Sequence, residues 1–402
     1  MFQNRTVLAL SFADAFSTLG DQVGLIALLW LVMTKSHNAT DMGILALLFG
    51  IPGLVSGPIA GIFMDGWSRK WTVVLANMVQ CTIFFLIAGF SSGRTVPISL
   101  YILVFVAGLF IPPTSIGSFV MIADNVGKDQ LLQANALNEL FSQVPLVIGP
   151  VVGGWLISMG GIRIALALDG VSFFLAGWAT LWVPNDHSFT DTVRSHASKQ
   201  FLFKPILRSL VFILKTPVVL WITLIALMMN GADGVLEVAL PLVIHKQLHL
   251  SATLLGTVWM AYAIGTAMGA FLNTVVHISN THRRVMVAMI IGWGVVMIVT
   301  GLMATRWSLL IGFGLAGVSF GAYPPMARTI VQSAIPHNSR GQIFSVRSSI
   351  LGMGVPIGAF LSGLANTYVP ASMIICFAGV SIGILGLLVW AFRLIDQPDP
   401  VT

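Results

Sequence analysis

Charged residues are scarce in this chain: Asp, Glu, Lys and Arg make up 8% of its 402 residues. A soluble globular protein carries about 25% charged residues, so the composition excludes a soluble multidomain protein. The 2 cysteines, Cys81 and Cys376, lie far apart in apolar stretches, which gives no basis for a disulfide or a cysteine metal site. The 8 histidines lie in or next to loops, which argues against a metal site or a proton relay built from histidine.

Hydrophobic residues take the place of the missing charges. They make up 56% of the chain, and the mean hydropathy is +0.93. Because a membrane span needs about 20 largely apolar residues, we expect an all-α membrane protein with twelve transmembrane helices. The expected spans are 6–33, 43–64, 71–90, 98–122, 135–158, 163–184, 217–244, 255–276, 286–304, 309–331, 345–365 and 373–392.

Lysine and arginine are unevenly distributed between the loops, and this predicts the orientation. With an inner N-terminus, most of the 20 cations fall on the inner side. Those on the outer side are Lys35, Arg94, Arg163, Lys246 and Arg306. We therefore expect both termini in the cytoplasm. The cations are scattered singly, so the net charge of +6 is a topology signal and does not indicate a nucleic-acid partner. The long first helix does not fit a cleavable signal peptide.

The longest predicted loop divides the chain into two halves. We expect a six-helix bundle at 1–184, a cytoplasmic linker at 185–216 and a second six-helix bundle at 217–402. The end of the linker, KQFLFKPILRSLVFILK, mixes bulky apolar residues with regularly spaced cations. This pattern fits either a helix lying in the membrane interface or a basic linker followed by an early start of the next span.

The two halves are related as a parallel repeat. GDQVGLIALLWLVMTK aligns without gaps to ADGVLEVALPLVIHKQ, so that Asp21 corresponds to Asp233. Pro112-Pro113 correspond to Pro324-Pro325 at the same separation, and RKWTVV corresponds to RRVMVA near the next inner loop. In transporters built from such repeats, the substrate site lies near the membrane midplane between the halves. We therefore expect two pseudo-symmetric bundles, with the first helix of each facing a central cavity.

Four acidic residues lie in these first helices, where a charge costs ~2.5–3.5 kcal/mol on insertion scales. Asp14 and Asp21 are seven residues apart, which is about two turns or ~10.5 Å along one helix face. Asp233 and Glu237 are four residues apart and also share a face. Intramembrane ionisable residues are candidates for function, so we predict that these four bind substrate or protons. The alternative is that some of them only form hydrogen bonds within the helix bundle.

Other polar residues in the spans have simpler interpretations. Asp169, in the sixth span, is expected to form a hydrogen bond to a neighbouring helix. Arg328 either extends to the inner surface or contacts substrate. Asp124 and Glu139 lie near inner helix ends, where charges are usually structural.

The first inner loop, GIFMDGWSRK at 61–70, resembles the signature between spans two and three of the major facilitator superfamily. The matching residues are Gly61, Asp65, Arg69 and Lys70. Gly66 and Ser68 stand where the family has Arg and Gly. The resemblance implies a gating role for this loop. Asp65 can either interact favourably with a nearby helix N-terminus or pair with a cation, for which Arg340 and Arg347 are the candidates. A solvated loop that carries inner-side cations would explain the same residues.

A second segment, VIGPVVGGWLI at 147–157, looks like the fifth-span signature of the exporters in this superfamily. The matching residues are Gly149, Pro150, Gly153 and Gly154. Gly149 and Gly153 form a face of small residues that allows close helix packing, and Pro150 bends the helix. The resemblance implies a role in antiport and in sealing the halves together, whereas ordinary close packing would also explain the residues.

Finer matches, STLGDQVGLIALLWLV, DQLLQANAL and IPHNSRGQIFSV followed by PIG, resemble the bacterial branch that holds macrolide-efflux proteins and the enterobactin exporter. The resemblance covers essentially the whole chain. It implies a secondary active multidrug exporter of the bacterial inner membrane, which exchanges amphipathic small molecules for protons by alternating access and confers antibiotic resistance. The implied partners are the substrate, protons and the lipid bilayer. We expect a monomer with no cofactor, no metal and no enzyme activity.

Three other functions stay open from the sequence. They are a dedicated exporter of a siderophore or other metabolite, a lipid flippase of the same fold, and a membrane scaffold or receptor that transports nothing. An anionic siderophore would favour a cavity of net positive potential, and the four acidic residues argue against such a cavity.

Overall fold

The computed structural model describes residues 5–392, apart from 37, 67, 92, 94, 126–130, 184–199, 276–281 and 336–339. Over these residues the protein is helical, without a β-strand. Among them, 10 helices are long and apolar enough to cross a membrane, and Ala39–Gly53 and Val144–Gly160 are shorter apolar helical stretches. The prediction of an all-α membrane protein is confirmed, while the number of twelve spans stays a prediction.

Two compact units divide the chain. Unit 1 comprises Met1–Arg194 and His249–Met260, and unit 2 comprises Ser195–Leu248 and Ala261–Thr402. The helix α9 (Ala252–Val275) therefore contributes its first turns to unit 1 and its remainder to unit 2.

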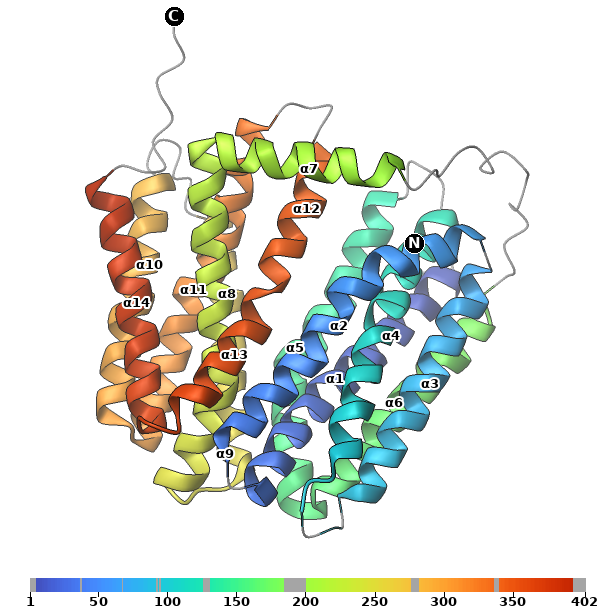
Figure 1. The fold of residues 1–402 in the computed structure, drawn as a ribbon, viewed down its shortest axis with the longest axis horizontal. Coiled ribbons are helices and arrows are strands. Elements are labelled where there is room, and N and C mark those ends of the chain that lie inside the picture. The colour runs from blue at the N-terminus through green and yellow to red at the C-terminus, as the bar shows by residue number, and fades with distance from the viewer. Residues whose placement is uncertain are drawn as a thin grey trace, which may run out of the picture. The chain divides into compact units, whose positions relative to one another are not determined.

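Unit 1 is a bundle in which the first and third helices make the main contacts (Figure 1). α1 packs against α5 and α6, α3 packs against α4 and α6, and α2 packs against α4. Between α5 and α6 the chain turns at Gly161, whose φ of 79° favours glycine. The helices are α1 (Arg5–Ser36), α2 (Ala39–Gly66), α3 (Arg69–Phe90), α4 (Ile98–Asp124), α5 (Leu131–Gly160) and α6 (Ile162–Leu181).

Unit 2 repeats this packing order. Its first membrane helix, α8, packs against α13 and α14, and α10 packs against α11 and α14. These pairs correspond to the contacts of α1 and α3 in unit 1, in agreement with the repeat found in the sequence. The helices are α8 (Pro217–Leu242), α10 (His282–Met303), α11 (Arg306–Ala334), α12 (Arg340–Gly352), α13 (Gly354–Ala365) and α14 (Ala371–Ala391).

The predicted span 345–365 is not one regular helix. α12 ends at Gly352 and α13 begins at Gly354, with Met353 between them. Two glycines weaken the helix at this point, and Pro356 supplies no backbone N–H to the preceding turn. Beyond the break, a Cβ atom at Gly358 would overlap the carbonyl oxygen of Gly231, so α13 lies in close contact with α8.

The helix α7 (Gln200–Lys215) lies across the end of α8 and packs against α8 and α12 (Figure 1). It is separate from α8 because the backbone is extended at Thr216, and α8 then starts with Pro217. Ser209 and Ile213 are buried, whereas Leu207 and Leu214 are exposed. The placement of this helix in the membrane interface stays a prediction.

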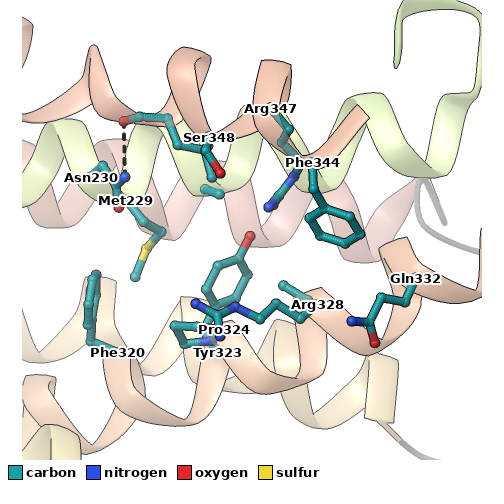
Figure 2. A pocket seen from close by; sticks show the side chains of 13 residues that line it. Met229, Asn230, Phe320, Tyr323, Pro324, Arg328, Gln332, Phe344, Arg347 and Ser348 are labelled. Atoms are coloured by element: carbon teal, nitrogen blue, oxygen red, sulfur yellow. Dashed lines mark hydrogen bonds between the residues drawn. The ribbon is translucent and has the colours of Figure 1, made fainter. Parts of the chain in front are cut away.

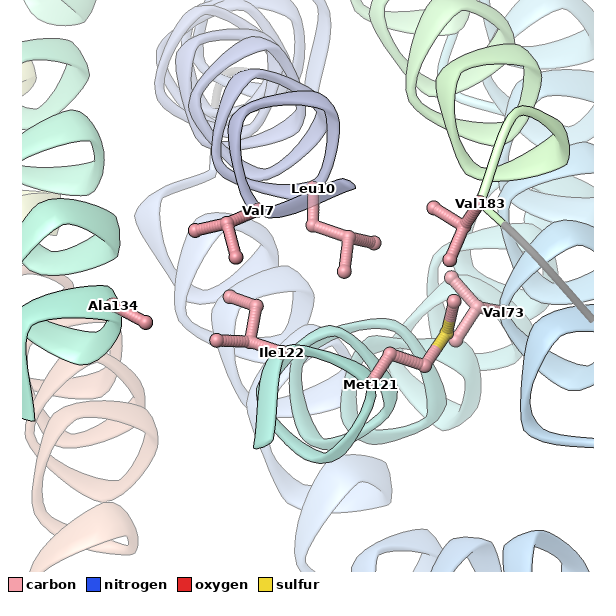
Figure 3. Packing of buried hydrophobic residues seen from close by; sticks show 7 residues of the cluster. All are labelled: Val7, Leu10, Val73, Met121, Ile122, Ala134 and Val183. Carbon is pink, nitrogen blue, oxygen red and sulfur yellow. The ribbon is translucent and has the colours of Figure 1, made fainter. Parts of the chain in front are cut away.

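One end of unit 1 is closed by buried apolar side chains from five helices or their ends (Figure 3). The cluster contains residues from the start of α1, α3 and α5, from the end of α4, and Val183, which follows the end of α6. Its members are Val7, Leu10, Val73, Met121, Ile122, Ala134 and Val183. The cluster packs the start of α1 against the neighbouring helices of unit 1.

Candidate functional site

The segment around Asp21 packs unusually closely against α6. Gly20 and Gly24 are one turn apart on α1 and so share a face. A Cβ atom at Gly20 would overlap the hydroxyl of Ser172, and a Cβ atom at Gly24 would overlap the carboxyl of Asp169. The α6 side chains therefore occupy the space that the two glycines leave, directly beside Asp21.

Asp169 is fully buried at this contact, with 0% of its surface exposed. Its Oδ1 lies 3.5 Å from Ser172 Oγ, but that hydroxyl donates more closely, at 2.7 Å, to the backbone carbonyl of Asp169 itself. Asp169 Oδ2 has no hydrogen-bond partner among the described residues. The expectation of a hydrogen bond from Asp169 to a neighbouring helix is therefore wrong.

Asp21 and Asp169 form a pair of carboxyl groups inside unit 1. The two groups interact electrostatically, and Asp21 Oδ1 is also buried without a hydrogen-bond partner among the described residues. Burying an unpaired charge is costly, so two acidic side chains that each have an unpaired buried oxygen mark a site with a purpose other than stability. Sequence reasoning singled out Asp21 and missed Asp169, although the Gly-x-x-x-Gly spacing around Asp21 was a signal for a close helix neighbour.

Asp14 has a different environment from Asp21. Its Oδ2 accepts a hydrogen bond of 3.2 Å from Asn138 Nδ2, which links α1 to α5. Two residues before Asp14, the ring of Phe12 packs edge to face on the ring of Phe141 at 4.7 Å, between the same two helices. Asp14 interacts electrostatically with Asp21. Its direct contacts favour the alternative that this carboxylate mainly holds the bundle together.

In unit 2, Asp233 is held by a tyrosine. Tyr262 Oη of α9 donates a hydrogen bond of 2.7 Å to Asp233 Oδ1. Tyr262 is itself 7% exposed and packs edge to face on Phe313 at 6.1 Å. Glu237, one turn further along α8, interacts electrostatically with Asp233. Each unit thus carries acidic residues in its first membrane helix, and a cavity shared by all four stays a prediction.

The fifth-span signature packs α5 onto the residues that follow Asp21. A Cβ atom at Gly149 would overlap the Gln22 side chain, and a Cβ atom at Gly153 would lie 3.2 Å from Val23 Cα. The close packing expected of these glycines is therefore present, and it holds Asp21 in place from the α5 side.

The other face of the same signature contacts the first turns of α9. A Cβ atom at Gly154 would overlap the carbonyl of Ala252, and one at Gly256 would overlap the carbonyl of Pro150. Ser158 Oγ accepts a hydrogen bond of 2.9 Å from Thr253 Oγ1 nearby. The role in antiport that the resemblance implies stays a prediction.

Lys70, in the inner-loop signature, caps a helix. Its Nζ donates hydrogen bonds of 2.7 Å to the carbonyl oxygens of both Leu181 and Val183, at the end of α6. A cation at this end satisfies free carbonyls and interacts favourably with the helix dipole. The surroundings of Gly61 and the side chains of Asp65 and Arg340 lie outside the described part of the chain, so the gating role stays a prediction.

A pocket of about 400 Å³ lies between α8, α11 and α12 in unit 2 (Figure 2). Arg328 and Arg347 line it, and none of its described lining residues is acidic. The argument against a cavity of positive potential concerned the cavity that the four acidic residues face, and it stays a prediction, since none of the four lines this pocket. Sequence reasoning could not find it, because Arg328 and Arg347 come from different helices. The polar lining side chains are Asn230, Tyr323, Arg328, Gln332, Arg347 and Ser348.

Comparison with known proteins decides the family. The model of the Major Facilitator Superfamily matches residues 10–277 and 222–402. The chain belongs to the major facilitator superfamily. This family membership agrees with the helical fold and with the resemblance seen in both signatures.

Relatives within the major facilitator superfamily align over nearly the whole chain. The multidrug efflux pump Tap of Mycolicibacterium fortuitum is 25% identical over 370 residues, which cover 89% of this chain and 88% of Tap. The enterobactin exporter EntS of Citrobacter koseri is 26% identical over 381 residues, which cover 92% of this chain and 88% of EntS. The crystal structure of the nucleoside transporter NupG matches with a TM-score of 0.77 at 14% identity, covering 98% of this chain and 100% of NupG, and this shows the shared fold.

Proposed function

We propose that this protein is a secondary active exporter of amphipathic small molecules in the bacterial inner membrane, which exchanges its substrate for protons by alternating access. The observation that carries the proposal is the pair of Asp21, which is half-buried, and Asp169, which is fully buried. Each has one buried carboxyl oxygen that lacks a hydrogen-bond partner among the described residues. Such a pair has a use in a transporter that binds and releases protons.

The proton site consists of these two carboxyl groups. A single proton between them supplies the missing hydrogen bond and removes one of two negative charges. When the proton leaves, the pair carries two charges that repel each other, and the close contact between α1 and α6 is weakened. Release of the proton is in this way linked to a rearrangement of α1.

Asp233 and Glu237 form the corresponding site in unit 2. Tyr262 donates its hydrogen bond to Asp233, and this bond fixes the position of the Asp233 carboxyl group. We assign Asp233 and Glu237 to binding of substrate or a second proton. The two carboxyl groups interact electrostatically, so a change in the charge of one affects the charge of the other.

The relatives support export as the direction of transport. Tap is named as a multidrug efflux pump and EntS as an enterobactin exporter, and both align over at least 88% of their length. A second candidate, export of one dedicated metabolite, is favoured by the EntS relatives from Citrobacter and Salmonella. Mass spectrometry of the medium from cells with and without the gene separates the two, because a dedicated exporter changes one secreted compound whereas a multidrug pump changes drug tolerance.

Reconstitution in liposomes tests the proposal directly. Purified protein is incorporated into vesicles with an acidic lumen, and uptake of a panel of amphipathic dyes is measured while the pH gradient and the membrane potential are imposed separately. We expect dye accumulation that depends on the pH gradient, together with alkalinisation of the lumen recorded by a trapped pH indicator. Dye uptake without proton movement would contradict antiport.

Three variants sharpen this test. Asp21→Asn and Asp169→Asn are expected to abolish accumulation driven by the pH gradient. Asp14→Asn is the matched control on the same helix, because an asparagine oxygen still accepts the hydrogen bond from Asn138. Accumulation at the wild-type level in both Asp21→Asn and Asp169→Asn would show that the pair does not couple transport to protons.

A further inference from the structure

We propose that the pocket between α8, α11 and α12 binds the anionic group of an aromatic amphipathic molecule. The pocket would give the exporter a class of negatively charged substrates. The proposal depends on the proposed function only for the statement that the bound molecule is transported, since binding itself can be measured without transport.

The charge of the pocket is the first argument. Arg347 is only 6% exposed, and Figure 2 shows its side chain pointing into the pocket from α12. Arg328 of α11 points into the same space, and the two guanidinium groups repel each other electrostatically. Without an acidic lining residue in the described part of the chain, the pocket holds two like charges without a counter-charge. Placing an anion between them removes this repulsion and forms charge-assisted hydrogen bonds.

The second argument is that Arg347 has N–H donors that no described residue accepts from. Its Nε donates a hydrogen bond of 3.1 Å to Thr223 Oγ1 of α8, which fixes the direction of the guanidinium. This bond uses one of five N–H donors. The other four are carried by the terminal nitrogens, and these form the two-pronged arrangement that matches a carboxylate, sulfonate or phosphate.

The remaining lining fits an aromatic ligand body. Phe320 and Phe344 line the pocket at opposite sides of the arginines, and Met229 lies beside Phe320 (Figure 2). A volume of about 400 Å³ is within the range of small-molecule sites. Tyr323 donates its hydroxyl proton to the carbonyl of Ile222, at 3.1 Å, so its oxygen is fixed in place. A ligand whose ring system lies between the two phenylalanines and whose acidic group lies at the two arginines contacts both the apolar and the cationic lining residues.

A purely structural role for the arginines explains less. The hydrogen bond from Arg347 to Thr223 links α12 to α8, but it needs only one arginine. Arg328 is exposed, and its presence in the same pocket adds repulsion without a hydrogen bond to another helix among the described residues. A ligand of opposite charge accounts for both residues at once.

Two dyes with the same ring system and opposite charge test the proposal. Fluorescein is an anion and rhodamine 123 a cation at neutral pH, and both have the xanthene ring. Their binding to the purified full-length protein in lipid nanodiscs is measured by fluorescence anisotropy. We expect fluorescein to bind and Arg328→Gln to weaken its binding about ten- to a hundredfold, the loss typical of a charge-assisted hydrogen bond, with rhodamine 123 binding unchanged or tighter.

The control variants keep the test decisive. Arg347→Gln is expected to act like Arg328→Gln, and its folding is checked by its melting temperature because Arg347 is buried. Arg306→Gln removes an exposed arginine of the same helix as Arg328, about 33 Å away along the axis, and it should bind fluorescein like wild type. Equal binding by Arg328→Gln and wild type, or equal weakening of both dyes, would overturn the proposal.

The outcome for transport is read separately. If fluorescein binding depends on the arginines but no fluorescein flux is seen in liposomes, the binding site is supported and export of fluorescein is rejected. Fluorescein flux that is unaffected by Arg328→Gln supports export and rejects the site.

Discussion

Gly24 of α1 and Asp169 of α6 share one small space between their helices: the Asp169 carboxyl lies where the Cβ atom of any larger residue at position 24 would be. The absence of a side chain at Gly24 therefore allows a fully buried carboxyl group to sit beside Asp21. The missing side chain at Gly24 thus explains both the close packing of α1 on α6 and the position of the Asp169 carboxyl group beside Asp21.

The first prediction concerns this contact. Gly24→Ala is expected to destabilise the protein by about 1–3 kcal/mol, the usual cost of overpacking, and to lower its melting temperature in detergent. Gly89→Ala is the control, because a Cβ atom at Gly89 meets nothing within 4 Å. Equal melting temperatures for the two variants would mean that α1 and α6 can move apart without cost.

The second prediction separates proton coupling from substrate binding. Asp169 is expected to couple transport to protons without contacting the substrate, because it is fully buried. Asp169→Asn should therefore lose dye accumulation driven by a pH gradient but keep the exchange of labelled for unlabelled dye across the membrane. Loss of both activities in a protein that remains folded would assign Asp169 to substrate binding or to the helix motion itself.

The third prediction concerns Tyr262 and Asp233. A hydrogen bond to a charged group contributes about 1.5–3 kcal/mol, and this bond is 2.7 Å long. In a double-mutant cycle of Tyr262→Phe and Asp233→Asn, the effects on melting temperature or transport are expected to be strongly non-additive. Additive effects would indicate that the two residues act independently.

The fourth prediction distinguishes two roles for Lys70. As a cap for α6, Lys70 contributes about 0.3–1 kcal/mol to the free energy of unfolding. Lys70→Ala should therefore slightly lower the melting temperature, and the folded variant should transport normally. Arg163→Ala removes an exposed cation at the opposite end of α6 and serves as the control. A loss of transport by Lys70→Ala without a change in stability would instead favour the gating role that the family resemblance implies.

Much of the architecture could be predicted from local sequence. The long apolar runs separated by short polar loops predicted helices that cross the membrane, because only a helix satisfies its own backbone hydrogen bonds in lipid. The alignment of Asp21 with Asp233 predicted the repeat, and the same packing order in both units agrees with it. The predicted span 345–365 agrees with the apolar helical stretch Val346–Ala365, but the break at Met353 inside it was not predicted.

The functional groups were only partly predictable. An acidic residue in an apolar run stands out because of its cost in lipid, which is why Asp21 and Asp233 could be found from their positions alone. Whether such a residue has a partner depends on other helices: Asn138 binds Asp14, Tyr262 binds Asp233, and no described residue satisfies Asp169 Oδ2.

Composition alone determined that this chain crosses the membrane as helices, because the length of an apolar run is a property of about 20 neighbouring residues. The alignment of the two halves added that the helices form a repeat. Only the tertiary structure decided that Asp169 lies against Gly24 and that Arg328 and Arg347 line one pocket. The physical reason is that the direction of a side chain around a buried helix, and the neighbour that it meets, are set by close packing between segments far apart in the sequence.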